Sequence, residues 1–209
     1  YALFRRGPLS AAPSQVGCFA RGEDGAEFPD LQYHVQPLSL DNFGEPLHRE
    51  PGFTASVCHL RPKSRGFVRV ASADPLAPPQ IDARHLSEES DRKIAARAIR
   101  HAREICAAAP LAKYAAREFA PGASLQSDAE LIKAAGMIST TIFHPCGTCK
   151  MGAENDDSAV VDSRLRVRGI SGLRVADASA MPDIISGNTN APTMMIAEKA
   201  AAMILEDNQ

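Results

Sequence analysis

The segment from His144 to Gly152 carries the residue best suited to proton transfer. His144 is followed by Pro145, which keeps the backbone of the histidine extended. Gly147 and Gly152 allow the chain to pass close to a flat or bulky group. A histidine fixed in such a segment is a good proton acceptor near neutral pH. The same ring could instead simply bond a neighbouring carbonyl, and the local sequence supports both interpretations.

The same segment contains a Cys-x-x-Cys pair, Cys146 and Cys149, which is typical of a redox dithiol or of half a zinc site. A thioredoxin-like dithiol usually lies at the start of a helix, whereas a polar Asp/Asn stretch follows here. The nearest other thiol and imidazole are those of Cys106 and His144, too few for a zinc shell. We therefore predict no metal site, and keep a redox or metal-binding module as the alternative function.

A second segment, residues 187–196, is predicted to be a loop that enters a helix at about Asn190. The start of a helix presents N–H groups without partners and a positive potential, so it can hold an anion. Ordinary helix capping by Asn190 or Thr193 is the alternative interpretation.

Short strands separated by Gly, Pro and Asp turns are predicted to position these segments. Residues 53–60 alternate most cleanly, with Phe53, Ala55 and Val57 on one face. Such strands favour an antiparallel sheet with one face covered. The predicted strands are 16–21, 31–38, 53–60 and 66–72.

Two helices are predicted after the strands. Ser87 is expected to cap the first, which should end before Pro110. The second runs from Ser127 to about Gly136 and begins with a Ser-x-x-Glu capping box. The remaining predictions are an extended 139–143, short strands at 160–162, 165–167 and 173–175, and a final helix at 190–206. This order of elements favours an α+β fold, in which helices flank an antiparallel sheet.

Composition excludes several classes of protein. The net charge is −2, the aromatic content is 5% and tryptophan is absent, which argues against a nucleic-acid partner. No apolar run approaches the roughly 18 residues that span a bilayer, so membrane association is not indicated. An odd number of cysteines, 5, fits a reducing compartment better than a disulfide framework, so we expect a cytoplasmic location.

Three dense segments in order resemble one family. They are His144-Pro145-x-Gly147-Thr148-Cys149-Lys150-Met151-Gly152, then Gly172-Leu173-Arg174-Val175-Ala176-Asp177-Ala178-Ser179-x-Met181-Pro182, then Asn188-Thr189-Asn190-x-x-Thr193-Met194-Met195-Ile196-Ala197-Glu198-Lys199. This combination resembles the glucose–methanol–choline (GMC) oxidoreductases, in particular the choline and alcohol dehydrogenase branch. Shorter family-like segments lie upstream at residues 7–10, 29–32, 61–66 and 74–75, so the resemblance covers nearly the whole chain.

The resemblance implies FAD-dependent oxidation of a small-molecule alcohol to a carbonyl, by hydride transfer to the flavin. By this resemblance, His144 and Asn190 form the catalytic pair. Asp177 and Ala178 match the segment that meets the ribityl–phosphate part of the flavin. Residues Asn190, Ala191, Pro192 and Thr193 match the helix start beside the pyrimidine ring, where positive potential would stabilise the reduced flavin.

The resemblance also implies a partner domain, because no Gly-x-Gly-x-x-Gly fingerprint for the ADP part of FAD is found. We expect residues 1–143 to be a substrate-binding lobe, and residues 144–209 to complete an FAD-binding domain formed by a preceding part of the same protein. The chain alone is expected to bind FAD weakly and to be inactive. Exposed apolar surface makes a homodimer a candidate assembly. For a quaternary ammonium substrate such as choline, the candidate contacts are Tyr33, Glu118 and Phe143.

Overall fold

The computed structural model describes residues 7, 10, 12, 14–22, 25–42, 44–114 and 117–208. Pro8 and Leu9, from one of the short family-like segments, lie outside the described residues. The chain divides into two compact units. The N-terminal unit comprises Tyr1–His59 and Glu88–Ser139, and the C-terminal unit comprises Leu60–Ser87 and Thr140–Gln209. The structure therefore groups Leu60–Ser87 with the C-terminal segment, whereas the sequence had placed these residues with the first lobe.

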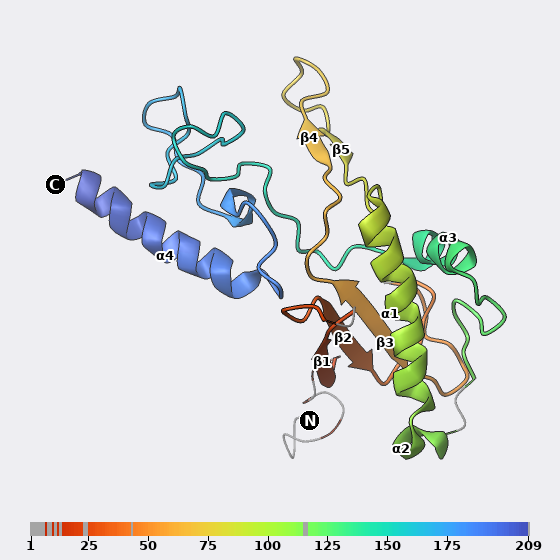
Figure 1. Cartoon of the computed structure of the whole chain (residues 1–209). Helices are drawn as coiled ribbons and strands as arrows, with labels where there is room; N and C mark the ends of the chain where they lie inside the picture. Colours follow the sequence, from red (N-terminus) through yellow and green to blue (C-terminus); the bar gives the residue numbers. More distant parts are fainter. Residues whose placement is uncertain are drawn as a thin grey trace. The chain divides into compact units, whose positions relative to one another are not determined.

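The N-terminal unit is built on an antiparallel sheet in the order β1-β2-β3 (Figure 1). Its strands are β1 (Val16–Ala20), β2 (Leu31–Gln36) and β3 (Thr54–His59). The register pairs Tyr33 with Cys18 on one side and Val57 on the other, so these three side chains share a face. Three of the predicted strands are thus confirmed, each with shorter ends.

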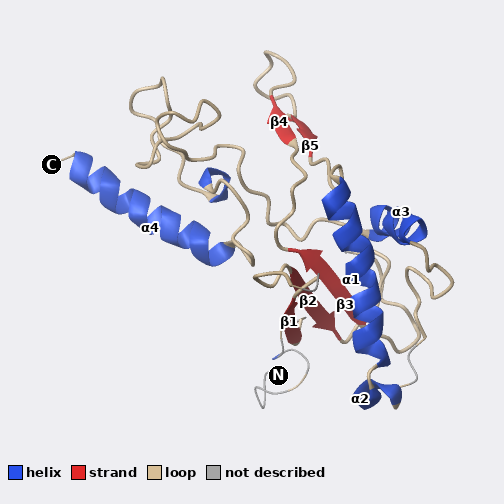
Figure 2. Ribbon diagram, in the orientation of Figure 1, coloured by secondary structure: helices blue, strands red, loops and turns tan. Residues whose placement is uncertain are grey.

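Helix α1 (Glu89–Ala107) covers that face of the sheet (Figure 2). Its Ile94 and Ala98 pack against Leu31 and Tyr33, all of them buried. The Tyr33 hydroxyl shares a 2.8 Å hydrogen bond with His101 Nδ1, and burial raises the pKa of Tyr33 far above its ordinary value. The apolar face of the sheet and the apolar stripe of the helix therefore form one core.

The helix ends agree only partly with the predictions. Helix α3 (Asp128–Ile138) begins with the predicted capping box, in which the Ser127 side chain accepts from the Glu130 amide and Glu130 accepts from the Ser127 amide. Helix α1 ends before Pro110 as predicted, but its N-cap is Glu88 rather than Ser87. A short α2 (Ala109–Ala112) follows, because proline is tolerated in the first turn of a helix.

The C-terminal unit has little regular structure before its last helix. It contains the hairpin of β4 (Phe67–Arg69) and β5 (Gln80–Asp82), the 3-10 turn η2 (Ala178–Ala180) and α4 (Asn190–Asp207). Strand β5 was not predicted, and the strands predicted after residue 160 are isolated bridges, such as that between Arg166 and Arg174. They stay short because Asp162 draws the amides of Arg164 and Arg166 into a turn. The core of this unit consists of Val161, Leu165, Ala180, Met181, Ile196 and Ala200.

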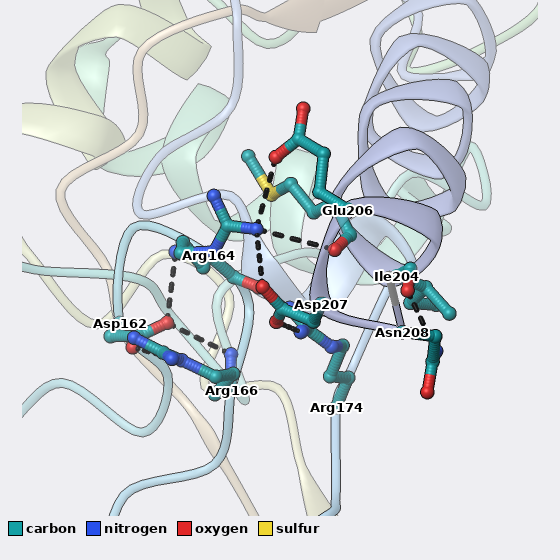
Figure 3. A network of polar contacts seen from close by, with 9 residues as sticks. Asp162, Arg164, Arg166, Arg174, Ile204, Glu206, Asp207 and Asn208 are labelled. Atoms are coloured by element: carbon teal, nitrogen blue, oxygen red, sulfur yellow. Dashed lines mark hydrogen bonds and ion pairs between the residues drawn. The ribbon is translucent and has the colours of Figure 1, made fainter.

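Two arginines fix the far end of α4 (Figure 3). Arg164 binds Glu206 at 3.1 Å and Asp207 at 2.8 Å, and Arg174 also binds Asp207. Carboxylates at the C-terminal end of a helix are unfavourable unless cations offset them, which these arginines do. Together with buried Ile196 and Ala200, the arginines fix the direction in which the first residues of α4 point.

Among the described helices, none combines the length and the apolar character needed to cross a bilayer.

Candidate functional site

His144 lies between two side chains from the residues that enter α4. Its Nε2 is 2.8 Å from Asn188 Nδ2, and its Nδ1 is 2.9 Å from Thr189 Oγ1. An amide nitrogen can only donate, so Nε2 is the acceptor of the first hydrogen bond. The neutral ring therefore carries its proton on Nδ1, and this N–H donates a hydrogen bond to Thr189 Oγ1. This arrangement leaves the basic lone pair on Nε2, on the side of Asn188.

The partner of His144 in the structure is thus Asn188 rather than Asn190. Asn190 is the first residue of α4, and its side-chain nitrogen contacts Met194 Sδ at 3.7 Å. A side chain within a helix meets the residue four positions further on, whereas Asn188 precedes the helix and can reach back to the histidine. In the structure the side-chain hydrogen bond to His144 Nε2 comes from Asn188, and the catalytic role expected for Asn190 stays a prediction.

Each of the two segments that reach the site contains a residue with left-handed backbone conformation. Phe143 has φ +63° and Ser186 has φ +57°, unusual values for residues other than glycine. The prediction of an extended 139–143 is therefore wrong at its end, since the Phe143 amide turns back to Thr141 Oγ1. Such conformations cost free energy and concentrate at functional sites. They turn the chain sharply next to His144 and just before Asn188.

The histidine segment lies along η2. The amide of Cys149 donates to Ser179 at 3.0 Å and that of Met151 donates to Ala180 at 2.9 Å. Gly147 has φ +88°, and a Cβ there would lie 3.5 Å from the carbonyl oxygen of Met181. The first and second family-like segments are therefore joined by backbone hydrogen bonds.

The residues predicted to meet the flavin's ribityl–phosphate part lie at the start of η2. The carboxylate of Asp177 accepts from the Ser179 amide at 2.8 Å and so caps this turn. The side chain of Asp177 therefore has a structural role. Because Asp177 is exposed, the backbone of Asp177 and Ala178 is the part that could contact a ligand.

The N-terminal end of α4 is not capped by the side chain of its N-cap residue. Thr189, the N-cap residue, makes no capping hydrogen bond through its side chain. Pro192 has no amide hydrogen, and Thr193 donates its amide to the Thr189 carbonyl at 3.0 Å. Asn190 and Ala191 are exposed, and their amides have no acceptor one turn earlier in the helix. These residues fit the anionic edge of a reduced flavin.

Cys146 and Cys149 are free thiols. Cys146 packs against the apolar core of its unit, and burial raises its pKa, an effect that Asp183 increases and Arg65 opposes. A thiol with a raised pKa is a poor nucleophile at neutral pH. Within the part of the chain that the structure describes, no group of three or more His, Cys, Asp or Glu residues is placed to hold a metal ion. The described residues therefore give no support to the metal-binding alternative, and the raised pKa of Cys146 argues against a reactive dithiol.

Two of the choline-contact candidates have structural roles. Tyr33 lies in the core under α1, and Glu118 forms a two-point ion pair with Arg103 at 2.9 Å. Phe143, by contrast, is 72% exposed and directly precedes His144. Of the three, Phe143 is the one that belongs to the same compact unit as His144.

Known proteins resemble this chain in sequence. The sequence model of the GMC oxidoreductase family matches residues 62–197. The chain is 40% identical to an alcohol dehydrogenase (acceptor) of Pseudomonas putida over 98% of its own length and 37% of the relative's. It is 43% identical to oxygen-dependent choline dehydrogenase 1 of Chromohalobacter salexigens over 95% of its length and 36% of the relative's.

Solved structures show the same likeness. Pyridoxine 4-oxidase from Mesorbium loti superimposes with a TM-score of 0.82 at 30% identity, over 91% of this chain and 37% of that one. A formate oxidase superimposes with a TM-score of 0.85 at 26% identity, over 97% of this chain and 40% of that one. The chain thus spans less than half the length of these relatives. Since the family model covers most of it, the chain belongs to the GMC oxidoreductase family.

Proposed function

We propose that this chain is the catalytic, substrate-facing part of an FAD-dependent enzyme that oxidises an alcohol to a carbonyl. The observation that carries the proposal is the pair formed by His144 Nε2 and Asn188 Nδ2, 2.8 Å apart at the start of α4. The names of the relatives, alcohol dehydrogenase and choline dehydrogenase, support an alcohol as substrate. The class covers choline-like, aliphatic and aromatic primary alcohols.

The two side chains have complementary chemistry toward an alcohol. His144 Nε2 accepts the hydroxyl proton, and Asn188 Nδ2 donates a hydrogen bond to the alcohol oxygen as it becomes negative. An alcohol oxygen that replaces the direct contact between the two groups would satisfy both. FAD, when bound, supplies the acceptor for the hydride that leaves the carbon. A primary alcohol that also gives up its hydroxyl proton to His144 would become an aldehyde.

The flavin would be held by the chain's own backbone and by a second domain. Asp177 and Ala178 offer main-chain groups, and Asn190, Ala191, Pro192 and Thr193 form the helix start with its positive potential. The ADP part of FAD needs a dinucleotide site, which we assign to an FAD-binding domain elsewhere in the same protein. The chain alone is expected to bind FAD weakly.

The test is alcohol-dependent reduction of the flavin, measured without oxygen in the full-length, FAD-loaded protein. We would offer choline, benzyl alcohol and 1-butanol in turn and follow the flavin absorbance. His144→Ala should lower the reduction rate by about 10² to 10⁴. The matched control is His85→Ala, because His85 is exposed and outside the site. A His144→Ala protein that retains its flavin and reduces it at the unaltered rate would refute the proposal.

A further inference from the structure

Thr189 is a buried threonine whose hydroxyl faces the histidine. Only 5% of the residue is exposed, and its Oγ1 lies 2.9 Å from His144 Nδ1. No part of the chemistry proposed above uses this hydroxyl. Its contact is on the opposite edge of the ring from Asn188.

The Thr189 hydroxyl does not cap the helix, although the residue occupies the N-cap position. Thr189 is the N-cap residue of α4, where a threonine usually accepts a hydrogen bond from an amide of the first turn. Here its backbone is already helical, at φ −86° and ψ −4°, and the side chain makes no capping bond. The helix gives up a stabilising contact, and the histidine gains one.

The backbone of Thr189 is held firmly enough to orient a ring. Its carbonyl accepts from the Thr193 amide at 3.0 Å and from the Thr193 hydroxyl at 2.7 Å. Helix α4 is in turn packed on the core through Ile196, which lies in its second turn and is 5% exposed. The position of the Thr189 hydroxyl is therefore set by the helix and its core.

We propose that Thr189 is a positioning residue that keeps the His144 ring protonated on Nδ1, so that Nε2 keeps its lone pair and can accept the alcohol proton. This inference rests on the proposed function of His144. Asn188 can only donate to Nε2, so the ring proton must be on Nδ1, and Thr189 Oγ1 is its acceptor. Without that acceptor the proton can move to Nε2 and the ring can turn. A ring protonated on Nε2 cannot take the hydroxyl proton.

The test compares Thr189→Val with Thr189→Ser in the full-length, FAD-loaded protein. Valine keeps the shape and removes the hydroxyl, whereas serine keeps the hydroxyl. Thr140→Val is the matched control, because Thr140 is exposed in the same unit and lies four residues before His144. Two readouts are needed: the tautomer of His144, from long-range ¹H–¹⁵N spectra of histidine-labelled protein, and the kinetics of flavin reduction by benzyl alcohol. The His144 resonances are those absent from His144→Ala.

The wild type should show Nδ1 protonated, and Thr189→Val should shift the ring toward the Nε2 tautomer. Its flavin-reduction rate should fall about 10- to 100-fold, by analogy with the loss of a hydrogen-bond partner that orients a metal-binding histidine. Apparent affinity for the alcohol should change little, and Thr189→Ser should recover both tautomer and rate. A wild-type ring protonated on Nε2 would overturn the inference. So would a Thr189→Val protein with an unchanged tautomer, whether or not its rate falls.

The spectra also separate this inference from the proposed function. If no alcohol reduces the flavin but the tautomer still responds to Thr189→Val and recovers in Thr189→Ser, the positioning role stands and the proposed activity fails. If His144→Ala abolishes flavin reduction while Thr189→Val changes neither readout, the activity stands and the positioning role fails.

Discussion

Replacing Asn188 and Asn190 separately by alanine distinguishes the pairing in the structure from the pairing first expected. Asn188→Ala removes the Nδ2 donor that lies 2.8 Å from His144 Nε2. Loss of one donor to an oxygen that becomes negative in the transition state usually costs about 10² to 10³ in rate, or about 3–4 kcal/mol. Asn190→Ala removes only a contact of 3.7 Å with the sulfur of Met194, a weak acceptor. Its effect on the rate should stay below about 10-fold, the equivalent of one ordinary hydrogen bond.

The assay is anaerobic stopped-flow reduction of the flavin in the full-length protein, with flavin content measured for each variant. Asn188→Asp adds a nearly isosteric comparison, because a carboxylate accepts hydrogen bonds and cannot donate to Nε2. It should lose at least as much rate as Asn188→Ala. The reasoning fails if Asn190→Ala is the slower of the two alanine variants, or if both retain the wild-type rate.

Three further predictions concern the C-terminal and N-terminal units. A Cβ on Gly66 would clash with the Asp82 carbonyl and lie 2.7 Å from the Ala83 backbone, so Gly66→Ala should destabilise the β4–β5 hairpin by about 1–3 kcal/mol; faster amide hydrogen exchange in β4 and β5 would show this. Gly136 in α3 has open space around it, so Gly136→Ala should stabilise the N-terminal unit by about 0.5–1 kcal/mol in denaturant unfolding, and a loss of stability would contradict this. In the loop after the histidine segment, hydrogen bonds from Ser158 and then from Lys150 lower the pKa of Asp156 to about 2. Because the pKa is lowered on folding, the stabilisation is complete above pH 4 and is lost as the pH falls toward 2; carboxyl titration by NMR should show that midpoint, and a midpoint near 4 would refute it.

The sequence predicted those elements whose signals are local. The capping box at Ser127 and the end of α1 before Pro110 depend on neighbouring residues, and both were confirmed. The strands of the first sheet followed from the alternation of side chains, with only their ends misplaced. Strand β5 was missed because its three residues are too few to show a period and depend on pairing with Phe67–Arg69.

The region after residue 160 shows why an extended sequence pattern need not give a strand. Val161 bridges both Met151 and Val167, but Asp162 accepts the amides of Arg164 and Arg166 and turns the chain at once. An aspartate that captures nearby amides competes with pairing between strands. The outcome of this competition depends on the orientation of the Asp162 side chain, which the hydrophobic pattern does not predict.

The choice between Asn188 and Asn190 depended on one boundary. Both belong to the same family-like segment, so the segment alone does not say which of them faces His144. The predicted helix start at Asn190 was correct, and this boundary indicates which asparagine can contact the histidine. A residue inside the first turn directs its side chain along the helix, whereas the two residues before the turn can reach back toward the loop that carries the histidine. Asn188 and Thr189, which make both contacts to the ring, are those two residues.

The start of α4 lacks a capping hydrogen bond from its N-cap side chain. A stable helix start usually satisfies its amides with its own N-cap side chain, but here the Thr189 hydroxyl is directed to His144. The lost contact is compensated elsewhere: Ile196 is buried in the core, and Arg164 and Arg174 bind the acidic far end of the helix. Because these contacts hold α4 in place without a cap, its first amides remain available. Departures from local rules with compensation at a distance are expected at functional sites, and this one lies beside the proposed catalytic pair.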